Sequence, residues 1–192
     1  MNMRPGQDLH LHTIYSKNDS AIVPEQTMEL ISKISHAEVI GVSDHLEHMN
    51  KDEFGNYRKQ AKHYGFLVGT EVDGPGSVDY AIEVEPEYYV YHCFNSDAAY
   101  KGAERLLATG KPLIIAHPMM LDTDLNRLPS ECFIEISNRY VWRNNWRKFF
   151  TPYLNRFRFV LSSDAHQPLM LNQTVARYVG KELGIKESMV FP

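Results

Sequence analysis

The chain of 192 residues is 43% hydrophobic and 23% charged, and 20 basic against 24 acidic side chains leave a net charge of −4. This length fits one domain with a sizeable core, and the apolar fraction excludes a disordered chain. The charge balance argues against binding to long nucleic acids, because such binding needs a clustered cationic surface.

Membrane insertion and secretion are not expected either. No apolar run reaches the roughly 18–20 residues needed to cross a bilayer, and the stretch from Met1 to Gln7 is polar. Two cysteines, Cys93 and Cys132, are too few for a disulfide scaffold. We therefore expect a protein without membrane contact in the reducing cytoplasm.

Short β-branched or aromatic runs alternate along the chain with stretches of helical spacing, which favours a parallel α/β arrangement. Strands are expected at 8–12, 39–43, 66–71, 88–94, 113–117, 133–137 and 159–163. The segments 79–84 and 88–94 are expected to form either a hairpin or one strand with an embellishment. Helices are expected near 25–35, opened by Pro24, and near 52–64, 98–109, 141–150 and 173–183. About seven strand–helix units favour a single-domain barrel, smaller than the usual barrel of about 250 residues.

The nine histidines are concentrated rather than scattered. Six lie within or at the C-terminal end of an expected strand: His10, His12, His45, His92, His117 and His166. Acidic residues accompany them at Asp8, Asp44, Glu71, Glu135 and Asp164. In a parallel barrel the C-terminal strand ends meet at one rim, where active-site groups gather.

The spacing within the first strand suggests how these groups converge. Side chains two residues apart on a strand share a face, so Asp8, His10 and His12 are expected to point the same way. Leu9 and Leu11 are then expected to pack outward against helices.

Asp164 and His166, just after the last expected strand, are also two residues apart and are expected to point the same way. Imidazoles and carboxylates together suit zinc, iron or manganese, whereas thiolate sites and all-oxygen calcium or magnesium cages need other ligands. A single His-x-His pair is more often part of a satisfied core. The joint occurrence at one rim favours a metal centre, because unpaired buried ions cost several kcal/mol each.

Seven segments carry these histidines and acids in a fixed order. They are Asp8-Leu9-His10-Leu11-His12-Thr13 (with Tyr15-Ser16 and Asp19), Val42-Ser43-Asp44-His45, Gly69-Thr70-Glu71, Tyr91-His92, Ala116-His117-Pro118, Glu135-Ile136-Ser137-Asn138 and Ser163-Asp164-Ala165-His166. In this order they resemble the motifs of the PHP (polymerase and histidinol phosphatase) family. The resemblance covers most of the chain.

The resemblance implies an α/β fold, a distorted (β/α)7 TIM-like barrel, with two or three divalent metal ions. One ion would be held by His10, His12, Glu71 and Asp164, and Glu71 would bridge to a second ion bound by His92 and His117. A third ion would take Asp19, His45 and His166. Asn18 and Asp19 compete for one ligand place, and Asp19 is chosen because an ionised carboxylate is the better ligand.

The resemblance further implies hydrolysis of a small phosphomonoester by a metal-activated hydroxide. The catalytic set would be His10, His12, Glu71, Asp164 and Asp44, with Asp44 and Asp8 expected to act by orienting ligand imidazoles. Arg139, Arg143 and Arg4 are candidates for a clamp on the anionic substrate.

Three alternatives stay open at this point: a phosphodiesterase or short-oligonucleotide hydrolase of the same family, a metal-dependent amidohydrolase, and a catalytically idle metal-binding module. The amidohydrolase usually needs a lysine at a middle strand end, and none stands there. The remaining histidines, His36, His48 and His63, are expected to face solvent. The aromatic cluster Trp142–Trp146–Phe149–Phe150 is expected to belong to the core or to an interface.

Overall fold

A computed structural model describes residues 5–191. Its central feature is a sheet of seven parallel strands whose order in space follows their order in sequence. The strands are β1 (Gln7–Asp8), β2 (Val39–Val42), β3 (Leu67–Val72), β4 (Tyr88–Tyr91), β5 (Leu113–Ile115), β6 (Phe133–Ser137) and β7 (Arg158–Ser162).

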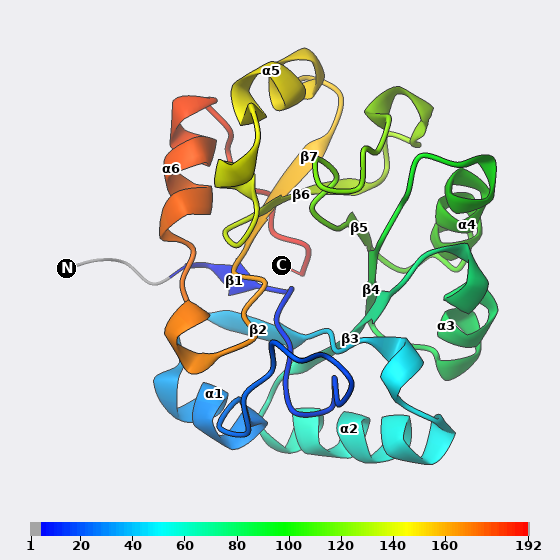
Figure 1. The fold of residues 1–192 in the computed structure, drawn as a ribbon, viewed down its shortest axis with the longest axis vertical. Coiled ribbons are helices and arrows are strands. Elements are labelled where there is room, and N and C mark those ends of the chain that lie inside the picture. Colours follow the sequence, from blue (N-terminus) through cyan, green and yellow to red (C-terminus); the bar gives the residue numbers. More distant parts are fainter. Residues whose placement is uncertain (1–4, 192) are drawn as a thin grey trace.

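Helices surround the ring of strands (Figure 1), and an α-helix lies in every connection between successive strands except that from β5 to β6, which contains a 3-10 turn (Leu125–Arg127). The α-helices are α1 (Met28–Ile34), α2 (Lys51–His63), α3 (Val78–Val84), α4 (Asp97–Leu107), α5 (Trp146–Phe150) and α6 (Thr174–Glu182). No helix within residues 5–191 combines the length and apolar character needed to span a bilayer.

The ring closes between the segments that follow β1 and β7. The amide of Asp164 donates to His10 O at 2.8 Å, and the amide of His12 donates to Ala165 O at 2.9 Å. Leu11 and Ala165 form a parallel bridge between these bonds. The fold is therefore a single-domain, distorted TIM-like barrel of seven parallel strands, which confirms the predicted barrel, although the strand β5 is not followed by an α-helix.

The barrel interior changes from apolar to polar along the strands. Its apolar layer consists of Leu9, Tyr88, Val90, Ile114, Ala116, Phe133 and Val160. Two residues further along the same faces, polar groups replace them: His92 follows Val90, and Glu135 follows Phe133. The C-terminal strand ends, which we call the barrel mouth, thus receive the charged side chains.

Tyr88 fills the interior because two neighbouring strands have no side chain at its level. A Cβ atom on Gly69 would lie 2.2 Å from Tyr88 Cζ, and one on Gly41 would lie 2.3 Å from the Tyr88 hydroxyl. The hydroxyl donates to Val42 O at 3.3 Å.

Gly69→Ala is therefore expected to destabilise the fold by about 3 kcal/mol or more, because the ring or the strand must shift. Gly55, inside α2, is the matched control, since a Cβ atom added there would meet nothing within 4 Å. Gly55→Ala is expected to stabilise the protein by about 1 kcal/mol through helix propensity. Urea unfolding of both variants measures the contrast, and similar stabilities would contradict this account of Tyr88.

Two expectations about helices were wrong. The segment expected as a strand over 79–84 belongs to α3, in which Val78 and Ala81 are buried one helical turn apart. Six residues of alternating polarity had fitted a strand equally well. The first helix does not open at Pro24: it begins at Met28, and the Thr27 hydroxyl caps it by accepting from the amide of Leu30.

The helix expected over 141–150 is interrupted. A 3-10 turn (Val141–Arg143) precedes α5, and the side chain of Asn145 caps α5 by accepting from the amide of Lys148. The break separates the aromatic cluster: Phe150 is buried, but the Trp142 side chain is 61% exposed. Trp142 thus does not join the core.

Candidate metal centre

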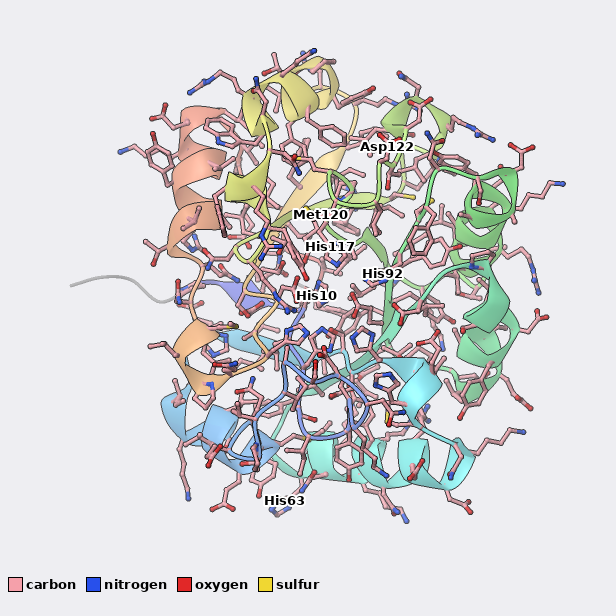
Figure 2. All side chains as sticks on the ribbon, in the orientation of Figure 1. His10, His63, His92, His117, Met120 and Asp122 are labelled. Carbon is pink, nitrogen blue, oxygen red and sulfur yellow. The ribbon has the colours of Figure 1, made fainter. Side chains whose placement is uncertain are left out.

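The histidines of the strand ends gather at the barrel mouth. Figure 2 shows His10, His92 and His117 close together near the centre of the barrel, whereas His63 lies at the outer edge on α2. Glu71, from β3, lies between them and is buried. The nitrogen and oxygen atoms of the cluster, which could hold a metal ion, are described below in three groups.

The first group joins the two ends of the barrel. His10 Nε2 and His12 Nε2 are 3.3 Å apart. Glu71 Oε1 is 3.0 Å from His10 Nε2, and Glu71 Oε2 is 3.4 Å from His12 Nε2. Asp164 Oδ1 is 3.8 Å from both nitrogens. All four residues are buried.

The second group shares Glu71 with the first. His92 Nε2 is 2.7 Å from Glu71 Oε1 and 3.1 Å from His117 Nε2. His117 Nε2 is 3.6 Å from the same Glu71 oxygen. Glu71 therefore stands where a carboxylate could bridge two ions.

The third group lies toward the loop after β1. His166 Nε2 is 2.9 Å from Asp19 Oδ2, and His45 Nε2 is 3.7 Å from it. Ligand atoms of His12, His45 and His166 also lie within 4.8 Å of one another. Asn18, the competing residue, is exposed.

Four of the rings are held through Nδ1 by groups that accept hydrogen bonds. His10 Nδ1 is 2.6 Å from Glu135 Oε1, and His92 Nδ1 is 2.5 Å from Asp73 Oδ1. His166 Nδ1 is 3.0 Å from the backbone oxygen of Asp164. Because carboxylate and carbonyl oxygens only accept, each of these Nδ1 atoms carries a proton, which leaves Nε2 of the neutral ring as the atom that can bind an ion.

His12 is fixed through a relay that ends on Asp44. The Ser16 hydroxyl donates to Asp44 Oδ1 at 2.8 Å, so it accepts from His12 Nδ1, which lies 3.2 Å away. Asp44 also accepts from the amides of Thr13 and Ser16 at 2.7 and 3.0 Å. Asp44 thus acts on His12 through Ser16 rather than by direct contact.

Asp8 does not orient a ligand imidazole, contrary to expectation. Its carboxylate accepts from the amide of Ser163 at 3.0 Å and lies 2.8 Å from His36 Nε2. Strand pairing is interrupted at Leu9 and His10. Leu9 therefore faces the barrel interior, not the helices, and Asp8 points away from His10.

His36 is correspondingly not the solvent-facing residue that was expected. Its side chain is 6% exposed and sits against Asp8. His48 is half-buried with its ring 5.1 Å from that of His45, whereas His63 is exposed as expected.

Two residues bearing on the centre were missed or given no role by sequence reasoning. Asp73 contacts His92 and lies with Oδ2 3.4 Å from His45 Nδ1. Its position two residues after Glu71, just beyond the end of β3, was the signal that could have found it. Glu135 holds the His10 ring and accepts from the amide of His117 at 2.5 Å.

The backbone is strained at two of the grouped residues. His117 has φ +23° and Asp164 has φ +52°, values in the left-handed region that residues with a Cβ rarely adopt. Such strain persists only where surrounding contacts enforce it, and it is often found at functional sites. Here the contacts are those of Glu135 to the His117 amide and of Asp164 N to His10 O.

The charges and the burial around each group determine the direction in which its pKa is shifted. Burial opposes the ionised carboxylate of Glu71, but the imidazoles around it outweigh burial and hold its pKa well below the usual value. Burial likewise disfavours a charged His10, but Glu135, Glu71 and Asp164 raise its pKa well above 6.5. Burial and the neighbouring rings of His166, His45 and His10 lower the pKa of His12.

The candidate arginines differ in their positions. Arg139 Nη1 lies 2.7 Å from His166 Nε2 and 3.6 Å from Asp164 Oδ1, so Arg139 reaches the cluster. Arg143 stacks on the Tyr140 ring and contacts none of the grouped residues. Arg4 lies outside the described residues.

The stability of the metal-free protein is expected to fall as the pH rises above 6.5. Burial opposes protonation of His45 and His92, but Glu71 and Asp73 outweigh it and raise their pKa values to about 9 and about 10. Their stabilising contribution is present below the unfolded value of 6.5 and is lost as the pH rises toward these values. Metal-bound rings must be unprotonated, so loaded protein should show the opposite trend.

Thermal melts between pH 6.5 and 8.5, with chelator and with added zinc or manganese, measure both trends. The variant His92→Gln should flatten the decline in chelator. Parallel pH slopes with and without metal would contradict the expected exchange of protons for ions.

Comparison of the chain with protein-family models and with curated proteins found no match in either case. The likeness to PHP motifs therefore rests on the motifs alone. Independently of it, the buried cluster of histidine, glutamate and aspartate could hold a metal ion.

Proposed function

We propose that this protein is a metal-dependent phosphoesterase that hydrolyses a small phosphomonoester at the barrel mouth. The observation that carries the proposal is the orientation of the imidazoles. The rings of His10, His12 and His92 direct Nδ1 at fixed acceptors, so their Nε2 atoms, once unprotonated, are available as ligands beside a shared carboxylate, Glu71.

The donor set itself supports ions rather than a purely structural network. Oε1 of Glu71 is buried among the Nε2 atoms of three imidazoles, so it is left without a donor when those rings are unprotonated. A buried carboxylate oxygen without a donor is costly unless a cation neutralises it. Nitrogen and oxygen ligands without thiolates suit zinc, iron or manganese.

The proposed sites follow the three groups. His10, His12, Glu71 and Asp164 would hold one ion, Glu71 with His92 and His117 a second, and Asp19 with His45 and His166 a third. When bound, such ions lower the pKa of a coordinated water toward neutrality and neutralise charge on phosphoryl oxygens.

The chain's own groups would place the ester for in-line displacement. Arg139 is the cation at the edge of the cluster, and its guanidinium can donate two parallel hydrogen bonds to a phosphoryl group. Asp44, Glu135 and Asp73 would keep the ligand rings in position while the substrate binds and leaves.

The contacts give less support to an amidohydrolase. Within residues 5–191 the ion pairs of the cluster include an arginine but no lysine, and the lysine ion pairs involve Glu53, Glu29, Glu83 and Glu87. A lysine on a middle strand is what that class usually requires for its metals. A phosphodiester would have one charge fewer for the same cationic centre.

Metal analysis of freshly purified protein, paired with a substrate panel, tests the proposal. We expect two to three divalent ions per chain and phosphate release from p-nitrophenyl phosphate that chelator abolishes and metal restores. Faster cleavage of the bis-p-nitrophenyl ester would favour the diesterase, and cleavage of amides alone would favour the amidohydrolase. Full activity in metal-stripped protein would overturn the proposal.

A further inference from the structure

A hollow of about 360 Å³ adjoins the metal centre between the loops that follow β6 and β7. Its lining includes Asn138, Arg139, Trp142, Arg143, Leu169 and Asn172. Arg139 belongs to both places, because it lines the hollow and also contacts His166 and Asp164. A molecule held by Arg139 at the cluster would therefore extend into this hollow.

Arg143 is the unusual member of the lining. Every other arginine within residues 5–191 has a hydrogen-bond or ion-pair partner, whereas no acceptor is found for Arg143. Its guanidinium instead lies 4.9 Å from the centre of the Tyr140 ring and 5.3 Å from that of Trp142. These two rings hold the cation in place and leave its donors free.

Two apolar side chains of the lining, Trp142 and Leu169, are exposed. Trp142 is 61% exposed and Leu169 is 89% exposed, so neither contributes much to the core. The break between the 3-10 turn and α5 is what leaves Trp142 on the surface. A flat apolar group lying in the hollow would cover part of both side chains.

We propose that this hollow receives the alcohol part of the substrate and selects phosphomonoesters whose alcohol part carries a second anionic group on a flat apolar or aromatic body. Arg139 binds the phosphoryl end, Arg143 binds the second anion, and Trp142 contacts the body between them. The inference rests on the proposed phosphoesterase function, since it names the class of ester that the same site takes.

Two esters that differ by one charge test the role of Arg143: phenyl phosphate and 4-carboxyphenyl phosphate. In Arg143→Gln, kcat/KM for the carboxylated ester should fall by about tenfold to a hundredfold, mainly through KM, as expected for a lost hydrogen bond to a charged group. For phenyl phosphate it should change by less than about twofold, because that contact is not made. Arg147→Gln is the matched control, since Arg147 pairs with the exposed Glu182 outside the hollow.

Trp142→Ala should lower kcat/KM for the two aryl esters to a similar degree, because both have the aromatic ring that Trp142 contacts. The proposed selection would be overturned if Arg143→Gln lowered kcat/KM equally for the two esters. It would also be overturned if the wild-type protein showed the same kcat/KM for both.

Calorimetry separates this proposal from the proposed function. Phenylphosphonate and 4-carboxyphenylphosphonate have a carbon–phosphorus bond and are not hydrolysed. Suppose that neither ester is turned over, but that the carboxylated phosphonate binds more tightly and this preference depends on Arg143. The phosphoesterase function is then overturned, and the anion selectivity of the hollow is supported. If both esters are turned over and the two phosphonates bind with equal affinity, the phosphoesterase function is supported and the anion selectivity of the hollow is overturned.

Discussion

His12→Ala is expected to lower phosphomonoester hydrolysis by about a thousandfold or more, to the background of the assay. His12 contributes to two of the three ligand groups, because its Nε2 lies near Glu71 and its ring lies 4.1 Å from that of His166. Its loss would therefore disturb two neighbouring sites at once. Steady-state assays with p-nitrophenyl phosphate and metal counts per chain measure the effect.

The same variant should still fold. Burial and the adjacent rings lower the pKa of His12, so the ring is neutral at pH 7 and its removal breaks no ion pair. Asp164→Ala should also abolish turnover, whereas His63→Ala, on the outer face of α2, should leave turnover unchanged. Turnover within tenfold of wild type in His12→Ala, at full metal content, would contradict the assignment.

Asp44→Ala is expected to destabilise the protein by about 3–5 kcal/mol. The buried carboxylate accepts four hydrogen bonds, two from the amides and two from the hydroxyls of Thr13 and Ser16. Alanine would leave the buried donors of the loop after β1 without partners. Urea unfolding in chelator measures the loss without a contribution from bound metal.

Asp44→Asn is a second, milder variant. Its amide oxygen can still accept hydrogen bonds from the loop after β1, whereas its amide nitrogen cannot. We expect a smaller loss of stability and a weakened hold on His12 through Ser16, seen as a metal affinity lower by about tenfold to a hundredfold. A loss below about 1 kcal/mol in Asp44→Ala would show that the loop does not depend on this residue.

Much of the fold followed from local pattern. The strand at 133–137 has the predicted bounds, because its apolar residues alternate between two packed layers and its ends carry clear turn residues. The error at α3 arose from length: over six residues a helical face and a strand face can place the same apolar positions. The break before α5 depends on how Asn145 caps the helix, which the Trp–Phe spacing did not reveal.

The residues expected at the metal centre come together because they mark strand ends, and parallel strands in a barrel bring those ends to one mouth. What the pattern could not give was the interruption at Leu9 and His10, which turns Asp8 toward His36 and Ser163. The orienting role of Glu135 depends on its contacts with His10 and His117, which belong to strands far apart in sequence. Such contacts leave no periodic signal.

The closure of the barrel ties assembly of the centre to the order of synthesis. His10 and His12 leave the ribosome first, yet their backbone is bonded to the segment of Asp164–Ala165, more than 150 residues later. Such long-range pairing forms late in folding, because the entropy of closing a large loop must be lost before the new contacts can stabilise the structure. A nascent polypeptide that lacks β7 therefore cannot hold the full ligand set, which would form only after β7 and the segment with Asp164 and His166 have been synthesised.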